Sequence, residues 1–211
     1  MKSEQQQFLV IFGKSGSGKS EILRCLHEKG EQVLDLERLA EHNGSAFGGL
    51  GGKQQPRQED FESEIKNMLA SFRTDRPVWV EYESNYLGRL QIPGSLMNEM
   101  SRGKLIVVDV PKERRIDRIV RTYSEYSIDK LLDAVAKIKR KLSPAKYHLV
   151  RRSIEERDYE TAVSLLLAYY DRIYQNALKR TNSCVLAEIE ISGNSAEDDA
   201  EKILDVVRLA I

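Results

Sequence analysis

The sequence predicts an α/β fold with a mostly parallel sheet. Short apolar runs alternate with helical patterns along most of the 211 residues, as they do where helices connect parallel strands. A glycine-rich turn joins the first apolar run to the first helix, and a long basic helical stretch interrupts the alternation later in the chain. We therefore expect five strands, helices on both faces of the sheet, and a helical, basic insertion.

Five apolar runs are the expected strands. The run at 7–12 contains β-branched and aromatic residues and stops at the glycine-rich turn, which is typical of a buried parallel strand. The other expected strands are 32–36, 77–81, 104–110 and 185–191.

Helical periodicity separates these runs. After the turn, Ile22, Leu23 and Leu26 recur at helical spacing, and Gly30 follows where a glycine commonly caps a helix. Pro111 opens a further helix at a position that tolerates proline. Outside the insertion, the expected helices are 21–29, 58–73 and 196 to the C-terminus.

The insertion is predicted to form a small helical lobe. Its pattern is helical from 114 to 180, and Ser143 with Pro144 marks one helix start as a cap followed by a first-turn proline. A chain of 211 residues suits one domain better than two large ones. We expect a single domain over 1–211 with a lobe at about 112–180.

Composition excludes several classes of protein. Hydrophobic residues make up 41% and charged residues 31%, which favours a globular chain over a disordered one. No run approaches the roughly 18 apolar residues of a membrane span, and 1–7 is too polar for a signal peptide, so we expect a cytoplasmic protein without membrane contact. Cys25 and Cys184 lack the spacing of a disulfide framework or a zinc site.

Residues 13–20 match the phosphate-binding loop pattern at every fixed position, between a strand and a helix. The turn predicts a P-loop NTPase-like, kinase-like fold, in which backbone N–H groups and the helix N-terminus attract a phosphate. Lys19 would reach the outer phosphate, and the Ser20 hydroxyl would bind Mg²⁺ if a metal is used. The pattern does not separate ATP or GTP from another diphosphate or triphosphate. The expected phosphate ligands are Gly13, Ser15, Gly16, Ser17, Gly18, Lys19 and Ser20.

Acidic residues stand at the ends of two expected strands. Glu81 and Glu83 end the strand at 77–81, and Asp35 ends the strand at 32–36. Because open α/β sheets bind ligands at the carboxyl edge, we expect these three acids, with Lys19, to be catalytic. The alternative for each acid is a helix cap or a solvated loop charge.

A glycine-rich stretch at 42–52 surrounds one aromatic residue, Phe47. Such a loop can close over a ligand, and an exposed Phe47 can stack on a base or cover an apolar group. Plain flexibility is the alternative interpretation.

A basic segment lies within a neutral chain. Residues 102–152 contain fifteen Lys and Arg against six Asp and Glu, an excess of +9. Arg114, Arg118 and Arg121 fall on one helix face. The segment is interpreted as a phosphate-contacting surface; a solvated helix surface and an arginine lid over a transferring phosphoryl group are the alternatives.

Taken in order, these motifs closely resemble the P-loop part of tRNA 2-selenouridine synthase, over nearly the whole chain. Two small departures are Ser20 in place of Thr and Asn85 where Arg commonly follows the Glu-Ser pair. The resemblance rests on 13–20, 33–37, 44–48, Gln58, Phe61, Glu62, 78–84, Gly88, Pro93, Tyr169, Tyr170, Asp171 and Tyr174.

The resemblance implies a transferase that acts on wobble 2-thiouridine in certain tRNAs. Family members alkylate the sulfur with geranyl diphosphate and then exchange the S-geranyl group for selenium from selenophosphate. It implies substrate contacts at Ser45, Phe47, Gly48, Ser84 and Arg89. With the basic segment, it predicts RNA contacts at Arg114, Arg115, Arg118, Arg121, Lys139 and Arg140.

Familiar members of the family carry a rhodanese domain with an essential cysteine before the P-loop domain. Here Met1 lies about a dozen residues before the phosphate loop, so we expect a split form, similar to some archaeal members, with a separate rhodanese chain as partner. Neither Cys25 nor Cys184 is expected to be an exposed, reactive thiol.

The prenyl diphosphate interpretation has two rivals. In the prenyl diphosphate interpretation, the loop amides and Lys19 stabilise the departing diphosphate, and Phe47, Leu50 or Trp79 shields the apolar tail. A core position is the favoured alternative for Trp79. The first rival is a small-molecule P-loop kinase, in which Asp35 orients an acceptor hydroxyl. The second is a non-catalytic subunit that binds nucleotide and tRNA and supports a partner chain.

Overall fold

The computed structural model describes residues 6–51, 54–181 and 183–210. The polar N-terminal residues 1–5, Gly52 of the glycine-rich stretch and the final Ile211 lie outside the described residues.

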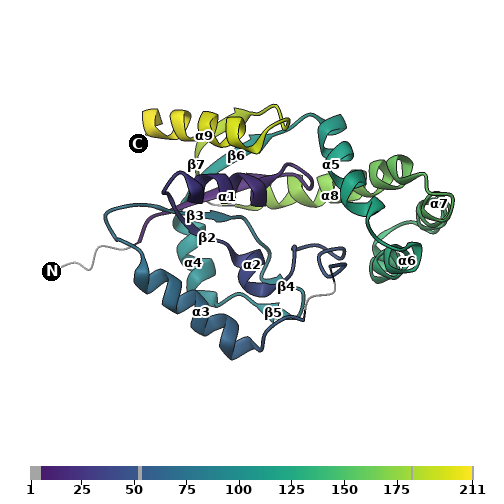
Figure 1. Ribbon diagram of the computed structural model, residues 1–211, viewed down its shortest axis with the longest axis horizontal. Helices are drawn as coiled ribbons and strands as arrows, with labels where there is room; N and C mark the ends of the chain where they lie inside the picture. Colours follow the sequence, from purple (N-terminus) through teal and green to yellow (C-terminus); the bar gives the residue numbers. More distant parts are fainter. Residues whose placement is uncertain (1–5, 52–53, 182, 211) are drawn as a thin grey trace.

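A five-stranded parallel sheet forms the centre of the protein (Figure 1). Its strand order is β2-β3-β1-β6-β7, and all four pairings are parallel. The predicted α/β, mostly parallel five-stranded sheet is therefore confirmed. The strands are β1 (Phe8–Gly13), β2 (Gln32–Leu34), β3 (Val78–Glu81), β6 (Lys104–Asp109) and β7 (Cys184–Glu190).

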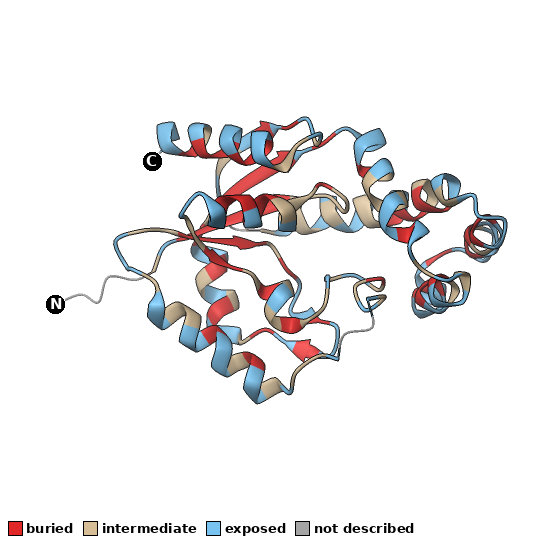
Figure 2. Cartoon of the chain, in the orientation of Figure 1, coloured by how far each residue is buried: buried red, intermediate tan, exposed pale blue. Residues whose placement is uncertain are grey.

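The two faces of the sheet bury separate cores because successive side chains of a strand point to opposite faces. Phe8, Val10 and Phe12 of β1 pack in one core with residues of α3 and α4, and Leu9 and Ile11 pack in the other with residues of α1 and α9. Figure 2 shows the central strands of the sheet and the inward sides of these helices as buried. The helices are α1 (Lys19–Glu28), α3 (Gln58–Ser71), α4 (Gly94–Arg102) and α9 (Ala196–Ala210).

A helical lobe projects from one end of the sheet (Figure 1). Its helices share a third core, and Ser143 accepts a hydrogen bond from the Lys146 amide as the predicted cap of α7. The long α8 leaves the lobe and returns to the sheet, where Tyr174 and Ala177 pack on the β1 core. The lobe comprises α5 (Lys112–Ser124), α6 (Ile128–Lys137), the short 3-10 helix η1 (Lys139–Lys141), α7 (Pro144–Glu155) and α8 (Tyr159–Arg180).

Three elements were not predicted from the sequence: the helix α2 (Leu36–Ala40), the hairpin of β4 (Tyr86–Leu87) and β5 (Leu90–Gln91), and α4. The expected strand at 32–36 ends early, at Leu34. The predicted end of this strand was wrong because the Asp35 carboxylate accepts a hydrogen bond from the Arg38 amide and caps α2. Within the described ranges, no helix is long and apolar enough to cross a membrane.

Candidate functional site

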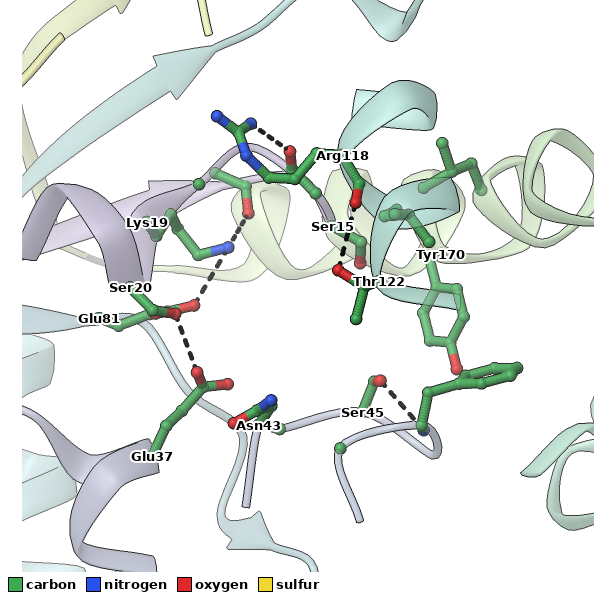
Figure 3. Close-up of a pocket in the computed structure, with 18 of the residues that line it drawn as sticks. Ser15, Lys19, Ser20, Glu37, Asn43, Ser45, Glu81, Arg118, Thr122 and Tyr170 are labelled. Carbon is green, nitrogen blue, oxygen red and sulfur yellow. Dashed lines mark hydrogen bonds and ion pairs between the residues drawn. The ribbon is translucent and has the colours of Figure 1, made fainter. Parts of the chain in front are cut away.

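A cavity of about 560 Å³ opens beside the phosphate loop at the carboxyl edge of the sheet (Figure 3). Its volume lies in the range of roughly 300 to 1,000 Å³ that is typical of small-molecule sites. One end is built by the loop after β1, the start of α1 and the end of β3. The other end is built by α5, α8 and the glycine-rich stretch.

The phosphate loop has the backbone that its glycines were expected to allow. Gly16 and Gly18 adopt φ angles of +80° and +81°, a left-handed conformation that side chains disfavour. A Cβ atom at Gly13 would lie 2.6 Å from the Ser17 hydroxyl oxygen. The loop is therefore a tight turn that leads directly into α1 at Lys19.

Lys19 and Ser20 meet two carboxylates at the polar end of the cavity (Figure 3). The Lys19 ammonium donates to the Gly13 carbonyl at 2.8 Å and lies 3.1 Å from a Glu81 oxygen. The Ser20 hydroxyl lies 2.9 Å from Glu37 and 3.1 Å from Glu81, and its single proton can be donated to one of them at a time. Among the predicted catalytic residues, Lys19, Glu81 and Glu83 thus line one cavity.

Three carboxylates gather beside Ser20. Oxygens of Glu37, Glu81 and Glu83 lie within 4.8 Å of one another. Burial, with the charge of Glu81, raises the pKa of Glu37 to about 8, and burial raises the pKa of Glu83 well above its usual range. So many negative charges at this spacing favour a bound proton or cation.

This set of oxygen atoms fits Mg²⁺, a hard cation that takes carboxylate and hydroxyl oxygens. Glu37, Glu81, Glu83 and Ser20 would hold the ion. Once bound, it would offset the charge of the carboxylates and of a phosphate in the loop.

Glu37 occupies the place expected for Asp35. Asp35 does not line the cavity, because it caps α2, whereas Glu37 in the first turn of that helix does line it. The catalytic role predicted for Asp35 has no support in this geometry. Reading Asp35 as a cap before the apolar pair Leu36 and Leu39 would have revealed the helix and its acidic first turn.

The far end of the cavity is apolar. Phe47, expected to be an exposed loop aromatic, is buried and stacks on Tyr123 with 5.0 Å between ring centroids. The stack fixes the glycine-rich stretch onto α5, and Ser45 supports it by accepting a hydrogen bond from the Phe47 amide. Gly48 also lines the cavity, and the apolar wall is completed by Leu50, Ile119, Val163, Leu166 and Leu167.

Trp79, Ser84 and Arg89 lie outside the cavity. Trp79 is buried in the core beneath α1, which confirms the core position that the sequence favoured. The Ser84 hydroxyl donates to the Tyr86 carbonyl, and the Arg89 guanidinium donates to backbone carbonyls of Gln55 and Pro56. Neither Ser84 nor Arg89 lines the cavity, so both stabilise the chain around the β4–β5 hairpin.

Two of the predicted RNA contacts instead support the phosphate loop. Arg115 is only 3% exposed, pairs with Asp171 at 2.8 and 2.9 Å, and donates to the Ser15 carbonyl at 3.2 Å. The prediction that Arg115 contacts RNA is therefore wrong. Arg118 lines the cavity and donates to the Gly16 carbonyl at 2.8 Å. The outward-facing cations of the predicted set are Arg114, Arg121, Lys139 and Arg140.

The two cysteines differ in exposure. Cys25 is buried, and burial raises the pKa of its thiol. Cys184 is exposed, contrary to expectation. It pairs in register with Lys104 at the amino end of β6, the edge of the sheet opposite the phosphate loop, and neither cysteine lines the cavity.

Residues 6–198 match the family model of the tRNA 2-selenouridine synthase AAA domain. The chain belongs to this family. The resemblance of the ordered motifs is thus confirmed. Asp171, which follows the tyrosine pair of α8, pairs with Arg115 beside the loop.

The chain is similar to parts of curated tRNA 2-selenouridine synthases. It is 40% identical to that of Nitrosomonas eutropha in an alignment of 124 positions, which covers 57% of this chain and 31% of that protein. It is 28% identical to that of Marinobacter nauticus in an alignment of 214 positions, which covers 87% of this chain and 57% of that protein. The chain therefore spans less than two thirds of the length of these relatives.

The structure is also similar, at low TM-scores, to solved structures of two kinases. Shikimate kinase from Acinetobacter baumannii has a TM-score of 0.47 and 19% identity, with 98% of this chain and 95% of that chain covered. Dephospho-CoA kinase from Campylobacter jejuni has a TM-score of 0.40 and 15% identity, with 98% of each chain covered.

The buried acid cluster predicts a pH-dependent stability. The folded state binds the Glu37 proton more tightly than the unfolded chain does. The contribution of this proton to folding stability is therefore full below about pH 4.5 and is lost as the pH rises through about 8. Glu37→Gln, which mimics the protonated form, should match the wild type near pH 5 and exceed it by about 1 to 3 kcal/mol above pH 8.

Urea denaturation at the two pH values measures the difference. Glu28→Gln, an exposed acid on α1, serves as the control and should show no such trend. A Glu37→Gln protein less stable than the wild type at both pH values would contradict the interpretation.

The buried ion pair of Arg115 and Asp171 predicts a second effect on stability, which comes from an unpaired charge. Asp171→Asn leaves the buried Arg115 guanidinium without its counter-charge and should lower the free energy of unfolding by about 2 to 4 kcal/mol. Asp117→Asn, which breaks the exposed contact with Arg114 at 3.9 Å, is the matched control and should cost less than about 1 kcal/mol. Equal losses in urea denaturation would show that the buried pair has no special role.

Proposed function

We propose that this chain binds geranyl diphosphate in the cavity and transfers the geranyl group to the sulfur of wobble 2-thiouridine in tRNA. The observation that carries the proposal is the continuity of the phosphate loop with an apolar wall inside one cavity. A prenyl diphosphate is charged at one end and hydrocarbon at the other. Phe47, Leu50 and Ile119 would contact the hydrocarbon while the loop holds the diphosphate.

The reaction has simple electronic demands. The sulfur forms a bond to C1 of the geranyl group as the bond from C1 to the diphosphate oxygen breaks. The diphosphate leaves with the electron pair, and N3 of the nucleoside loses a proton. Negative charge on the leaving group is stabilised by the loop amides and Lys19, while the Glu81 carboxylate favours positive charge on the allyl group.

Selenium exchange requires more than this cavity. In the proposed second step, selenophosphate supplies selenium and the S-geranyl group leaves the nucleoside. Because neither Cys25 nor Cys184 lines the cavity, we propose that a rhodanese partner supplies the cysteine.

Transfer to RNA also requires a surface for tRNA. Lys139, Arg140 and Lys141 are exposed on the 3-10 helix between α6 and α7, and the Lys139 ammonium lies 5.4 Å from the centroid of the Tyr147 ring. Arg114 and Arg121 add exposed positive charge on α5. We propose that these outward-facing cations contact the tRNA backbone.

The proposed activity is tested by incubating the purified chain with geranyl diphosphate and a 2-thiouridine tRNA and weighing the nucleosides. We expect S-geranyl-2-thiouridine, with 2-selenouridine formed only when selenophosphate and a rhodanese protein are added. Lys19→Ala should weaken geranyl diphosphate binding about ten-fold or more in calorimetry, since charge-assisted hydrogen bonds are lost. Lys29→Ala, at the other end of α1, is the control and should bind normally.

Other outcomes would identify the rivals. ATP turnover without RNA, together with no geranylated nucleoside, would indicate a small-molecule kinase. Nucleotide and tRNA binding without any product would indicate a non-catalytic subunit. Unchanged geranyl diphosphate affinity in Lys19→Ala would contradict binding at the loop.

The RNA surface predicts a change in salt dependence. The double variant Lys139→Ala with Arg140→Ala should weaken tRNA binding and lower the slope of log affinity against log salt by about 0.7 to 0.9 for each lost phosphate contact. A variant with Lys66→Ala and Arg73→Ala removes the same charge from exposed positions at and after α3 and should retain the slope. If the two double variants behave alike, tRNA binds elsewhere.

A further inference from the structure

A second cavity, of about 610 Å³, adjoins the first. It lies between α4 and α8, with Val10 of the central strand among its lining residues. Tyr82, Glu83, Ile173 and Ala177 line both cavities, so a ligand in the second cavity would lie next to one in the first.

One face of α8 forms a wall of the second cavity. Ile173, Asn176, Ala177 and Arg180 line it, and their spacing of three, one and three residues places them on one side of the helix. The face extends about 10 Å along the helix axis from Ile173 to Arg180. The wall therefore leads from the shared boundary at Ile173 to a cation at the end of the helix.

The lining combines three kinds of chemistry. Tyr82, Met97 and Met100 offer aromatic and polarisable surface, and Ile173 is exposed beside them. Ser101, Asn176, Thr181 and Ser183 offer neutral hydrogen-bonding groups. Arg180 is exposed, and its guanidinium makes no ion pair or hydrogen bond with another described residue.

We propose that the second cavity receives the target nucleobase of the RNA, turned out of its loop, with Arg180 on the adjacent backbone phosphate. The proposal rests on the proposed function, because it supplies the acceptor for the group transferred from the first cavity. Bases turned out of single-stranded loops are recognised by stacking and by hydrogen bonds to their edges. The polarisable side chains of the lining can stack on a base, and the Asn176 amide can form hydrogen bonds with the edge of the base.

Other ligand classes fit the cavity less well. A free polyphosphate carries several negative charges, and Arg180 is the single cation among the described residues that line this cavity. A hydrocarbon chain would leave the Asn176 amide of the lining without a partner. A nucleotide instead directs its neutral base toward Glu83 and Tyr82 and its single phosphate toward Arg180.

The test compares neighbouring substitutions on α8 in the full chain. Arg180→Ala and Asn176→Leu alter the cavity, whereas Arg172→Ala and Gln175→Leu make the same changes at exposed positions that line neither cavity. The substrate is an anticodon stem-loop RNA with 2-thiouridine at the wobble position. We expect each cavity variant to raise KM for the RNA about five- to ten-fold, with geranyl diphosphate affinity in calorimetry unchanged and both control variants at wild-type values.

A second measurement separates this inference from the proposed function. The same stem-loop with photoreactive 4-thiouridine at the wobble position should cross-link to Met97, Met100 or the 173–180 segment, whether or not geranyl transfer occurs. Failure of the wild type to bind geranyl diphosphate, with these cross-links present, would overturn the proposed reaction but leave the base site. Cross-links confined to other segments would overturn the base site. Cavity variants that match their controls in an active protein would also overturn it, and the cavity would then bind a protein segment or another ligand.

Discussion

The ion pair between Arg115 and Asp171 joins three parts of the molecule that are distant in sequence. Arg115 comes from α5, Asp171 from α8, and the Ser15 carbonyl that Arg115 also contacts belongs to the phosphate loop. A guanidinium this deeply buried is stable only when its charge is matched. The pair thus fixes the helical lobe against the loop, and the lobe supplies the apolar half of the cavity.

At the polar end of the cavity, by contrast, charges of the same sign lie close together. Lys19 is the cation of the loop that contacts the acid cluster, and it faces three carboxyl groups. Two of these, Glu37 and Glu83, have raised pKa values because of burial and of the charge of Glu81. Adding a diphosphate brings further negative charge to this place. A bound cation at Ser20 and the carboxylates, or protons on Glu37 and Glu83, would offset that charge, so ligand binding at this site is coupled to one or the other.

Local patterns in the sequence were enough to predict the sheet and the phosphate loop. The strands and helices that were expected form within two residues of their predicted bounds, because apolar runs, caps and the loop glycines act over a few residues. The errors concern contacts between distant segments. Phe47 is buried only because Tyr123 covers it, 76 positions later in the sequence, and Arg115 is removed from the surface by Asp171. Asp35 is the exception, since its capping pattern is local and a helix cap was the stated alternative to the catalytic role expected for it.

The end of β3 determines how two substrates can meet. The Tyr82 amide continues the ladder by donating to the Ile11 carbonyl at 2.9 Å, and the Tyr82 ring packs on Phe12 with 4.4 Å between centroids. Successive residues of an extended chain alternate in direction, yet Tyr82 and Glu83 both reach the boundary of the two cavities, whereas Glu81 lines the first alone. The backbone that follows β3 therefore forms part of the wall between the proposed donor and acceptor sites, together with Ile173 and Ala177 of α8. Because Tyr82 is held by the Ile11 carbonyl and the Phe12 ring, the fold would set the distance between the two groups of the proposed reaction.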